Sequence, residues 1–69
     1  MSTRRVRLKQ WDKRRGTEKA HLFIDPNTLQ ELWIPRSLVS HISRDMPDTQ
    51  GIRSCTVEVE DWFADKENL

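Results

Sequence analysis

Basic side chains crowd the N-terminal part of the 69-residue chain and are its clearest candidates for chemistry. Residues 1–19 hold eight Lys and Arg residues against two acidic ones, whereas residues 20–69 hold four against nine. Clustered guanidinium and ammonium groups bind the phosphates of nucleic acids electrostatically. The residues predicted to make such contacts are Arg5, Arg7, Lys9, Lys13, Arg14 and Arg15.

Two aromatic residues add a means of holding bases. Phe23 and Trp33 lie in neighbouring predicted strands, and aromatic rings on a sheet face stack unpaired bases with little regard to sequence. Together with the basic residues they predict binding of single-stranded nucleic acid. In the alternative, both rings pack on the second side of a small barrel and contact no ligand.

Acidic residues near the C-terminus point to a different partner. Glu58, Glu60, Asp61 and Asp65 are expected on an outward surface. Such a surface fits a basic groove on a nucleic-acid enzyme, which the protein would inhibit or regulate by imitating a phosphate backbone. Two plainer interpretations stay open: a solubilising tail, or neutralisation of the basic N-terminal segment lying beside it.

Catalysis is not expected from this chain. His21 and His41 are twenty residues apart, and Cys55 sits in an alternating apolar segment, as a small core residue would. The spacing of His, Cys and carboxylates matches no zinc pattern, and Gly16 and Gly51 stand alone rather than in a phosphate-binding loop. We therefore expect no catalytic residue, no metal and no cofactor.

Cysteine content and hydropathy indicate the compartment. A single cysteine forms no intramolecular disulfide, and a secreted domain of this size normally carries several. No apolar run approaches the length of a membrane span, and none follows the basic N-terminus as in a signal peptide. These features predict a cytoplasmic protein that does not enter membranes.

Alternation of apolar and polar residues predicts four strands, over 5–10, 19–25, 29–34 and 54–60. A turn at Asp25-Pro26-Asn27-Thr28 should join the second and third strands as a hairpin. We expect one face of that hairpin to be aliphatic and the other to carry Phe23 and Trp33. The predicted core residues are Leu22, Ile24, Leu32, Ile34, Val57 and Val59.

The remaining segments complete the predicted domain. Leu38 and Ile42, four residues apart, favour a short helical turn over 37–42, and 43–53 should be a long polar loop. Asp61 is expected to cap a last helix over 62–66, and residues 1–5 to form a flexible basic arm. The fold class is mostly β: one domain over 1–69, with a small antiparallel sheet or half-open barrel of about four strands and a short C-terminal helix.

Two stretches of this pattern resemble a group of small uncharacterised bacteriophage proteins. In that group a hairpin ending in Trp-Ile-Pro-x-Ser is followed, after a variable loop, by a Val-x-Val strand and a Trp-containing tail. The matching residues here are Trp33-Ile34-Pro35-Arg36-Ser37 and Val57-Glu58-Val59 with Trp62. The resemblance covers roughly 19–66 and omits the basic N-terminal segment, and Asp61 stands where a proline is common. It implies a phage-type accessory protein in the host cytoplasm, so the enzyme inhibited or regulated in the alternative would be one of the host. It supplies no site residues.

Overall fold

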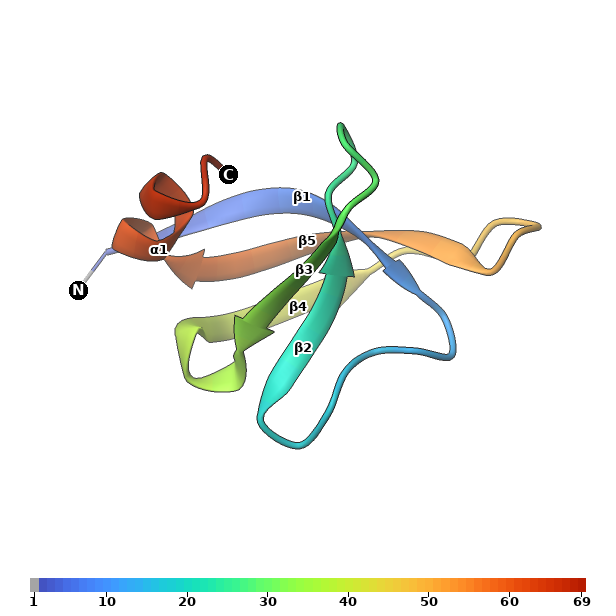
Figure 1. Ribbon diagram of the computed structural model, residues 1–69, viewed down its shortest axis with the longest axis horizontal. Helices are drawn as coiled ribbons and strands as arrows, with labels where there is room; N and C mark the ends of the chain where they lie inside the picture. Colours follow the sequence, from blue (N-terminus) through green and yellow to red (C-terminus); the bar gives the residue numbers. More distant parts are fainter. Residues whose placement is uncertain (1) are drawn as a thin grey trace.

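A single five-stranded antiparallel sheet organises the chain in the computed structural model, which describes residues 2–69 (Figure 1). The strands are β1 (Thr3–Trp11), β2 (Ala20–Ile24), β3 (Glu31–Pro35), β4 (Val39–Arg44) and β5 (Ile52–Glu60). A 3₁₀ turn, η1 (Arg36–Leu38), connects β3 to β4, and the helix α1 (Asp61–Lys66) follows β5. The order across the sheet is β3-β2-β1-β5-β4. This arrangement confirms the predicted mostly β class with a short C-terminal helix.

The long antiparallel pair of β1 and β5, the β1–β5 ribbon, forms the centre of the sheet. Its nine residue pairs run without a bulge from Thr3 opposite Glu60 to Trp11 opposite Ile52. Opposed residues share a face in an antiparallel pair, so the alternating apolar residues of both strands meet on one side. Val6 faces Val57 and Leu8 faces Cys55 in this way.

The core lies on that inner side and is closed by the hairpin and the helix. Phe23 from β2 and Ile34 from β3 join the buried residues of β1 and β5, and Phe63 and Ala64 of α1 complete the cluster. Of the six predicted core residues, Leu22, Ile24, Ile34, Val57 and Val59 are buried, whereas Leu32 is only partly buried. Trp62, the neighbour of Phe63 in α1, is 53% exposed.

The β2–β3 hairpin forms as predicted, but its register differs from the expected one. Leu22 opposes Trp33 and Phe23 opposes Leu32, so Phe23 and Trp33 lie on opposite faces of the sheet. The turn closes because the Asp25 carboxylate accepts the Asn27 and Thr28 amide hydrogens. The connection spans 25–30, with Leu29 in the left-handed region at φ 61°. A change of one residue in the length of a hairpin loop moves every side chain of the following strand to the opposite face. The length of the 25–30 connection therefore explains why Phe23 and Trp33 do not share a face as predicted.

The predicted helical turn over 37–42 is wrong beyond Leu38, because residues 39–44 form β4, a strand that the sequence pattern did not predict. A bulge between Val39 and His41 shifts the pairing with β5, so that Val39 opposes Val59 and Ile42 opposes Val57. The inserted residue breaks the period of two and imitates helical spacing. The polar loop is correspondingly shorter than 43–53 and covers 45–51.

The start of β1 and the start of α1 both differ from the sequence prediction. Residues 3–5 belong to β1 and pair with β5 instead of forming a flexible arm, while residue 1 lies outside the described residues. The helix begins at Asp61, with Glu60 as N-cap and no side-chain cap bond. The Asp61 carboxylate is engaged elsewhere, 2.7 Å from Nη2 of Arg4.

Candidate nucleic-acid interface

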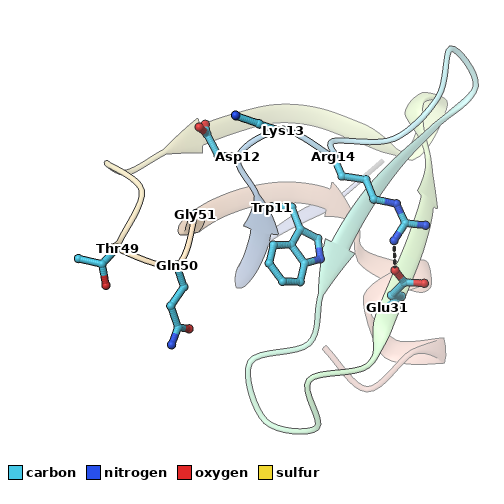
Figure 2. Close-up of a pocket in the computed structure, with 8 residues that line it drawn as sticks. All are labelled: Trp11, Asp12, Lys13, Arg14, Glu31, Thr49, Gln50 and Gly51. Carbon is cyan, nitrogen blue, oxygen red and sulfur yellow. Dashed lines mark hydrogen bonds and ion pairs between the residues drawn. The ribbon is translucent and has the colours of Figure 1, made fainter.

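Trp11 ends the outward row of β1 and forms the wall of a surface cavity. Because side chains alternate along a strand, Trp11 shares the outer face with Arg5, Arg7 and Lys9, and it is 38% exposed. The cavity measures about 650 Å³ and lies between the end of β1, the 45–51 loop and the start of β3. Figure 2 shows residues 49–51 on one side of the indole and Arg14 with Glu31 on the other. The lining residues are Trp11, Asp12, Lys13, Arg14, Glu31, Thr49, Gln50 and Gly51.

Two basic side chains stand at this cavity. Arg14 Nη1 lies 2.5 Å from Glu31 Oε2, and both side chains are about half exposed. Lys13 forms no ion pair with any carboxylate that the structure describes. Solvent-exposed ion pairs contribute only about 0–1 kcal/mol, so the Arg14 guanidinium is easily transferred to another anion.

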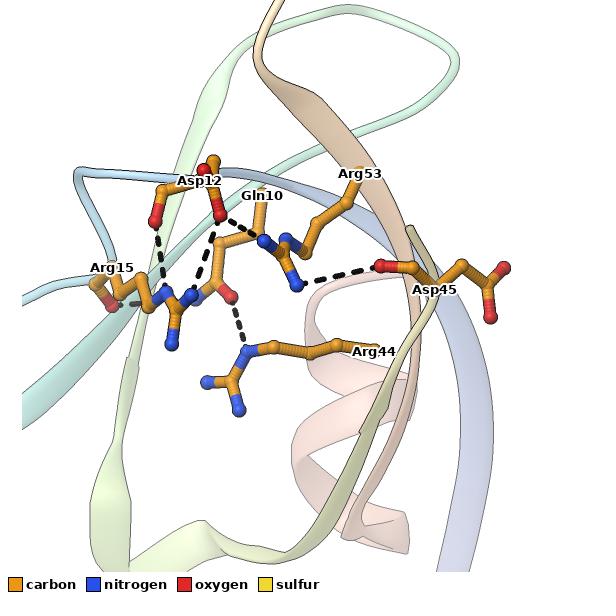
Figure 3. A network of polar contacts seen from close by, with 6 residues as sticks. All are labelled: Gln10, Asp12, Arg15, Arg44, Asp45 and Arg53. Atoms are coloured by element: carbon orange, nitrogen blue, oxygen red, sulfur yellow. Dashed lines mark hydrogen bonds and ion pairs between the residues drawn. The ribbon is translucent and has the colours of Figure 1, made fainter. Parts of the chain in front are cut away.

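A network of hydrogen bonds and ion pairs next to the cavity fixes the loops that line it (Figure 3). The Asp12 carboxylate accepts hydrogen bonds from Arg15 and Arg53, and Arg53 also donates to the Asp45 carbonyl at 3.4 Å. The side chain of Gln10 is fully buried, and its Nε2 donates to the carbonyls of Arg15 and Leu22 at 3.3 and 3.1 Å. The 12–19 and 45–51 loops are thereby joined to the end of β1.

This network decides the sign of the local charge. Asp12 and Glu31 are the acidic groups of the cavity, but Asp12 is already held by two arginines. The lining itself holds two basic residues, Lys13 and Arg14, against these two acids, and Arg15 and Arg53 add positive charge from outside the lining through their pairs with Asp12. The cavity around Trp11 therefore favours an anionic ligand.

Gly16 is the residue that lets the 12–19 loop lie against β2. Its φ of +127° falls in a region that favours glycine, and an added Cβ would meet the backbone of Ala20, His21 and Leu22. The close approach allows the Leu22 amide to donate to the Arg15 carbonyl at 2.9 Å. The loop that carries Lys13, Arg14 and Arg15 is thus fixed to the sheet.

The structure separates the two aromatic residues that were predicted to stack bases. Phe23 is fully buried in the core, so its ring cannot reach a ligand, and that prediction is wrong. Trp33 is 45% exposed and opposes Leu22. Lys9 opposes Ile24, which in turn opposes Glu31, so the side chains of Lys9, Trp11, Glu31 and Trp33 all point to the outer side of the sheet.

The basic residues of β1 are less free than the charge distribution indicates. Arg5 lies 3.6 Å from Glu58, and Arg7 lies 3.1 Å from Asp45 and donates to Thr56 at 2.7 Å. Lys9 is half-buried. Since β1 pairs with β5 over its whole length, much of the N-terminal positive charge is compensated by the acidic half of the chain, as one interpretation anticipated.

The alternative acidic surface is compensated in the same manner. Arg4 bridges Asp61 and Asp65, with its Nη2 2.7 and 2.8 Å from their carboxylates. The hydrogen bond to Asp65 raises the pKa of Arg4 above its usual value. Glu58 is paired with Arg5, and Glu60 is partly buried, with one carboxylate oxygen enclosed. These four acids do not form an uncompensated acidic patch.

The residues considered for catalysis and metal binding are dispersed. Cys55 is buried in the core, and this burial raises the pKa of its thiol, which keeps the thiol protonated. His21 lies on β2 and His41 on β4. Within residues 2–69 no three His, Cys, Asp or Glu side chains are close enough together to hold a metal ion.

Trp11 is the site residue that the sequence prediction missed. It continues the outward row Arg5, Arg7, Lys9 by one further step, so the alternation itself placed it beside the basic residues. The predicted strand over 5–10 stops one residue before it, whereas β1 continues to Trp11.

No helix within residues 2–69 is both long and apolar enough to span a membrane. The resemblance to the bacteriophage proteins remains a prediction that rests on its motif residues. No protein-family model, curated protein or solved structure matches the chain.

Proposed function

We propose that this protein is a non-catalytic module that binds single-stranded nucleic acid at the cavity around Trp11. One observation carries the proposal: a partly exposed indole and the basic side chains of Lys13 and Arg14 line the same cavity. A base needs an aromatic surface, and the phosphate beside it needs a cation. The volume of about 650 Å³ also lies within the usual range for small-ligand sites.

The surrounding charges support a strand rather than a neutral ligand. Arg14 is held only by an exposed pair with Glu31, and a phosphate would compete with that carboxylate for the guanidinium. Lys13 is exposed and unpaired with any described carboxylate, so it can meet a second phosphate. Both contacts are electrostatic and independent of base identity, as is stacking on an indole. The expected binding is therefore weak in sequence preference and strong in salt dependence.

Trp33 provides a second aromatic surface on the same outer side of the sheet. It is two residues beyond Glu31 along β3, and it is 45% exposed. A strand that stacks one base on Trp11 and follows Arg14 and Glu31 reaches β3 next. Trp33 is therefore retained from the original set of base-stacking residues, whereas Phe23 is not.

The test is a fluorescence-anisotropy titration of a labelled oligothymidylate with the intact chain at low salt. Trp11→Ala should weaken binding by roughly 5- to 150-fold, the equivalent of about 1–3 kcal/mol for a stacked base. Trp62→Ala is the matched control, because Trp62 is also exposed but lies on α1, against the opposite end of β1. The absence of binding at low salt, or equal losses in the two variants, would refute the proposal.

A further inference from the structure

A second cavity, away from Trp11, contains the two arginines that form no ion pair with the carboxylates of residues 2–69. It lies between β2, η1 and β4, and its volume is about 380 Å³. His21, Arg36, Ser40, His41 and Arg44 line it together with two aliphatic side chains, and no Asp or Glu is among the lining residues. We refer to it as the β2–β4 cleft.

The two arginines of this cleft are distinguished from all others in the chain. The sequence contains eight arginines. Six of them form ion pairs with carboxylates: Arg4, Arg5, Arg7, Arg14, Arg15 and Arg53. Arg36 and Arg44 form none with the carboxylates of residues 2–69, and these two line the same cleft. Uncompensated arginines that converge in one place are the usual signature of an anion site.

Both guanidinium groups are held in position by neutral acceptors. Arg36 donates from Nε and Nη2 to the Thr17 carbonyl, at 3.0 and 2.8 Å. Arg44 donates from Nε to the buried Gln10 side chain at 2.9 Å. In Figure 3 the two outer nitrogens of Arg44 have no partner among the residues drawn, and the structure gives them no hydrogen bond within the described chain. They are therefore available as a two-pronged donor.

The pKa of His21 is affected by the same positive charges. Burial and the charges of Arg36 and Arg44 together lower the pKa of His21, and its Nε2 lies 3.4 Å from Arg36 Nη1. His41 projects from the edge strand opposite Glu58 of β5. The Glu58 carboxylate is paired with Arg5, so the cleft keeps its positive charge.

We infer that the β2–β4 cleft binds a phosphate group, with Arg44 and Arg36 as its principal donors. The Arg44 guanidinium, held at Nε alone, presents its two remaining nitrogens to two phosphate oxygens at once, which is the geometry that arginine prefers for this ligand. Arg36 offers Nη1, since its Nε and Nη2 both donate to the Thr17 carbonyl. The site is separate from the Trp11 cavity in its residues. It neither requires nor follows from the binding of bases there.

The experiment follows the two histidine C2–H signals by NMR while inorganic phosphate is added to the intact chain at constant ionic strength. It is run at about pH 6.5, the ordinary pKa of histidine, with chloride as the reference anion. The signals are assigned with His21→Gln and His41→Gln. We expect a saturable shift of the His21 signal with phosphate, together with a rise in its pKa. A shift no larger than that produced by chloride would overturn the inference.

Arg44→Gln should weaken phosphate binding by roughly 10- to 150-fold, as expected for loss of hydrogen bonds between charged groups. Lys66→Gln is the matched control, because it removes the same charge from an exposed position of α1 that does not line the cleft. Arg44 is tied to the interior, so Arg36→Gln serves as a second variant whose side chain is exposed. Unchanged binding in the folded Arg36→Gln and Arg44→Gln proteins would contradict the assignment.

The source of the phosphate is determined with three probes: inorganic phosphate, thymidine monophosphate and an oligothymidylate. If all three depend on Arg44, the site accepts any phosphate group. If the oligonucleotide binds more tightly than the other two probes and loses the most affinity in Arg44→Gln, the ligand is the nucleic-acid backbone. Independence of Arg44 for every probe would refute the site. Trp11→Ala should leave phosphate binding in the cleft intact, so failure of the base-binding proposal and failure of this one are distinguishable.

Discussion

The buried side chain of Gln10 accepts a hydrogen bond from Nε of Arg44 at 2.9 Å, and this contact links β1 to the edge strand β4. The two residues are separated by β5 in the sheet and by 34 positions in the sequence. The amide nitrogen of Gln10 meanwhile donates to the Arg15 and Leu22 carbonyls. One side chain therefore supports both the 12–19 loop beneath Trp11 and the arginine of the β2–β4 cleft.

Replacement of Gln10 should destabilise the fold. Gln10→Ala leaves the Leu22 carbonyl without its side-chain donor and Arg44 Nε without an acceptor in a buried setting. We expect a loss of about 1–3 kcal/mol in the free energy of unfolding, measured by urea denaturation. Gln30→Ala is the control, because that side chain is exposed and should change stability by no more than about 0.5 kcal/mol. Equal effects of the two substitutions would show that the network contributes nothing.

Gly16→Ala should be more disruptive than Gly51→Ala, although both glycines have positive φ values. At Gly16 an added Cβ would lie 2.8 Å from the Leu22 nitrogen and 2.9 Å from the His21 Cα, whereas at Gly51 it meets nothing within 4 Å. Backbone strain of about 1–3 kcal/mol is expected in either variant, and at Gly16 the larger φ and the close approach of the 12–19 loop to β2 both add to it, so the difference in stability measures these two effects together. Thermal unfolding of the two variants gives this difference. Equal melting temperatures would show that the loop does not need the approach.

Strand content was predictable from the sequence because β1 and β5 alternate strictly and pair without a bulge. β4 was not, because the bulge between Val39 and His41 breaks the period of two. The faces of the β2–β3 hairpin depended on the length of the 25–30 connection, which a turn motif alone does not determine. Phe23 therefore lies in the core and not at the predicted interface.

The site was predictable only in part, because it depends on contacts between distant segments. Lys13 and Arg14 were identified by composition, and Trp33 by its aromatic ring. The pairing of Arg5 with Glu58 and of Arg7 with Asp45 requires the β1–β5–β4 order, which local patterns do not specify. Gln10 is a further example. A glutamine at the end of an alternating strand is expected on the polar surface, but Gln10 is buried because the 12–19 loop, β2 and β4 pack around it and bond to its side chain.

Removal of a single unpaired cation should alter the salt dependence of oligonucleotide binding without affecting stacking. Lys13→Gln should reduce the slope of log affinity against log salt by about 0.7, the value for one phosphate contact on a single strand. Lys66→Gln removes the same charge from α1, at the other end of the β1–β5 ribbon, and should leave the slope unchanged. The measurement is anisotropy at four or more salt concentrations. A similar change in both variants would indicate a general effect of net charge and no contact at Lys13.

Stability should fall on mild acidification because of His21. Its pKa in the folded protein is lowered by burial and by Arg36 and Arg44, so below the ordinary histidine value of 6.5 the unfolded chain binds a proton more readily than the folded one. The free energy of unfolding must then rise with pH from the lowered folded pKa up to about 6.5 and level off above it. His21→Gln should remove this slope, and urea midpoints of the wild type and the variant, measured at intervals between about pH 5 and pH 8, provide the comparison. Added phosphate should flatten the slope in the wild type, because an anion in the β2–β4 cleft offsets the charges of Arg36 and Arg44 and raises the pKa of His21 toward its ordinary value. A slope that survives in His21→Gln would assign the acid sensitivity to another group.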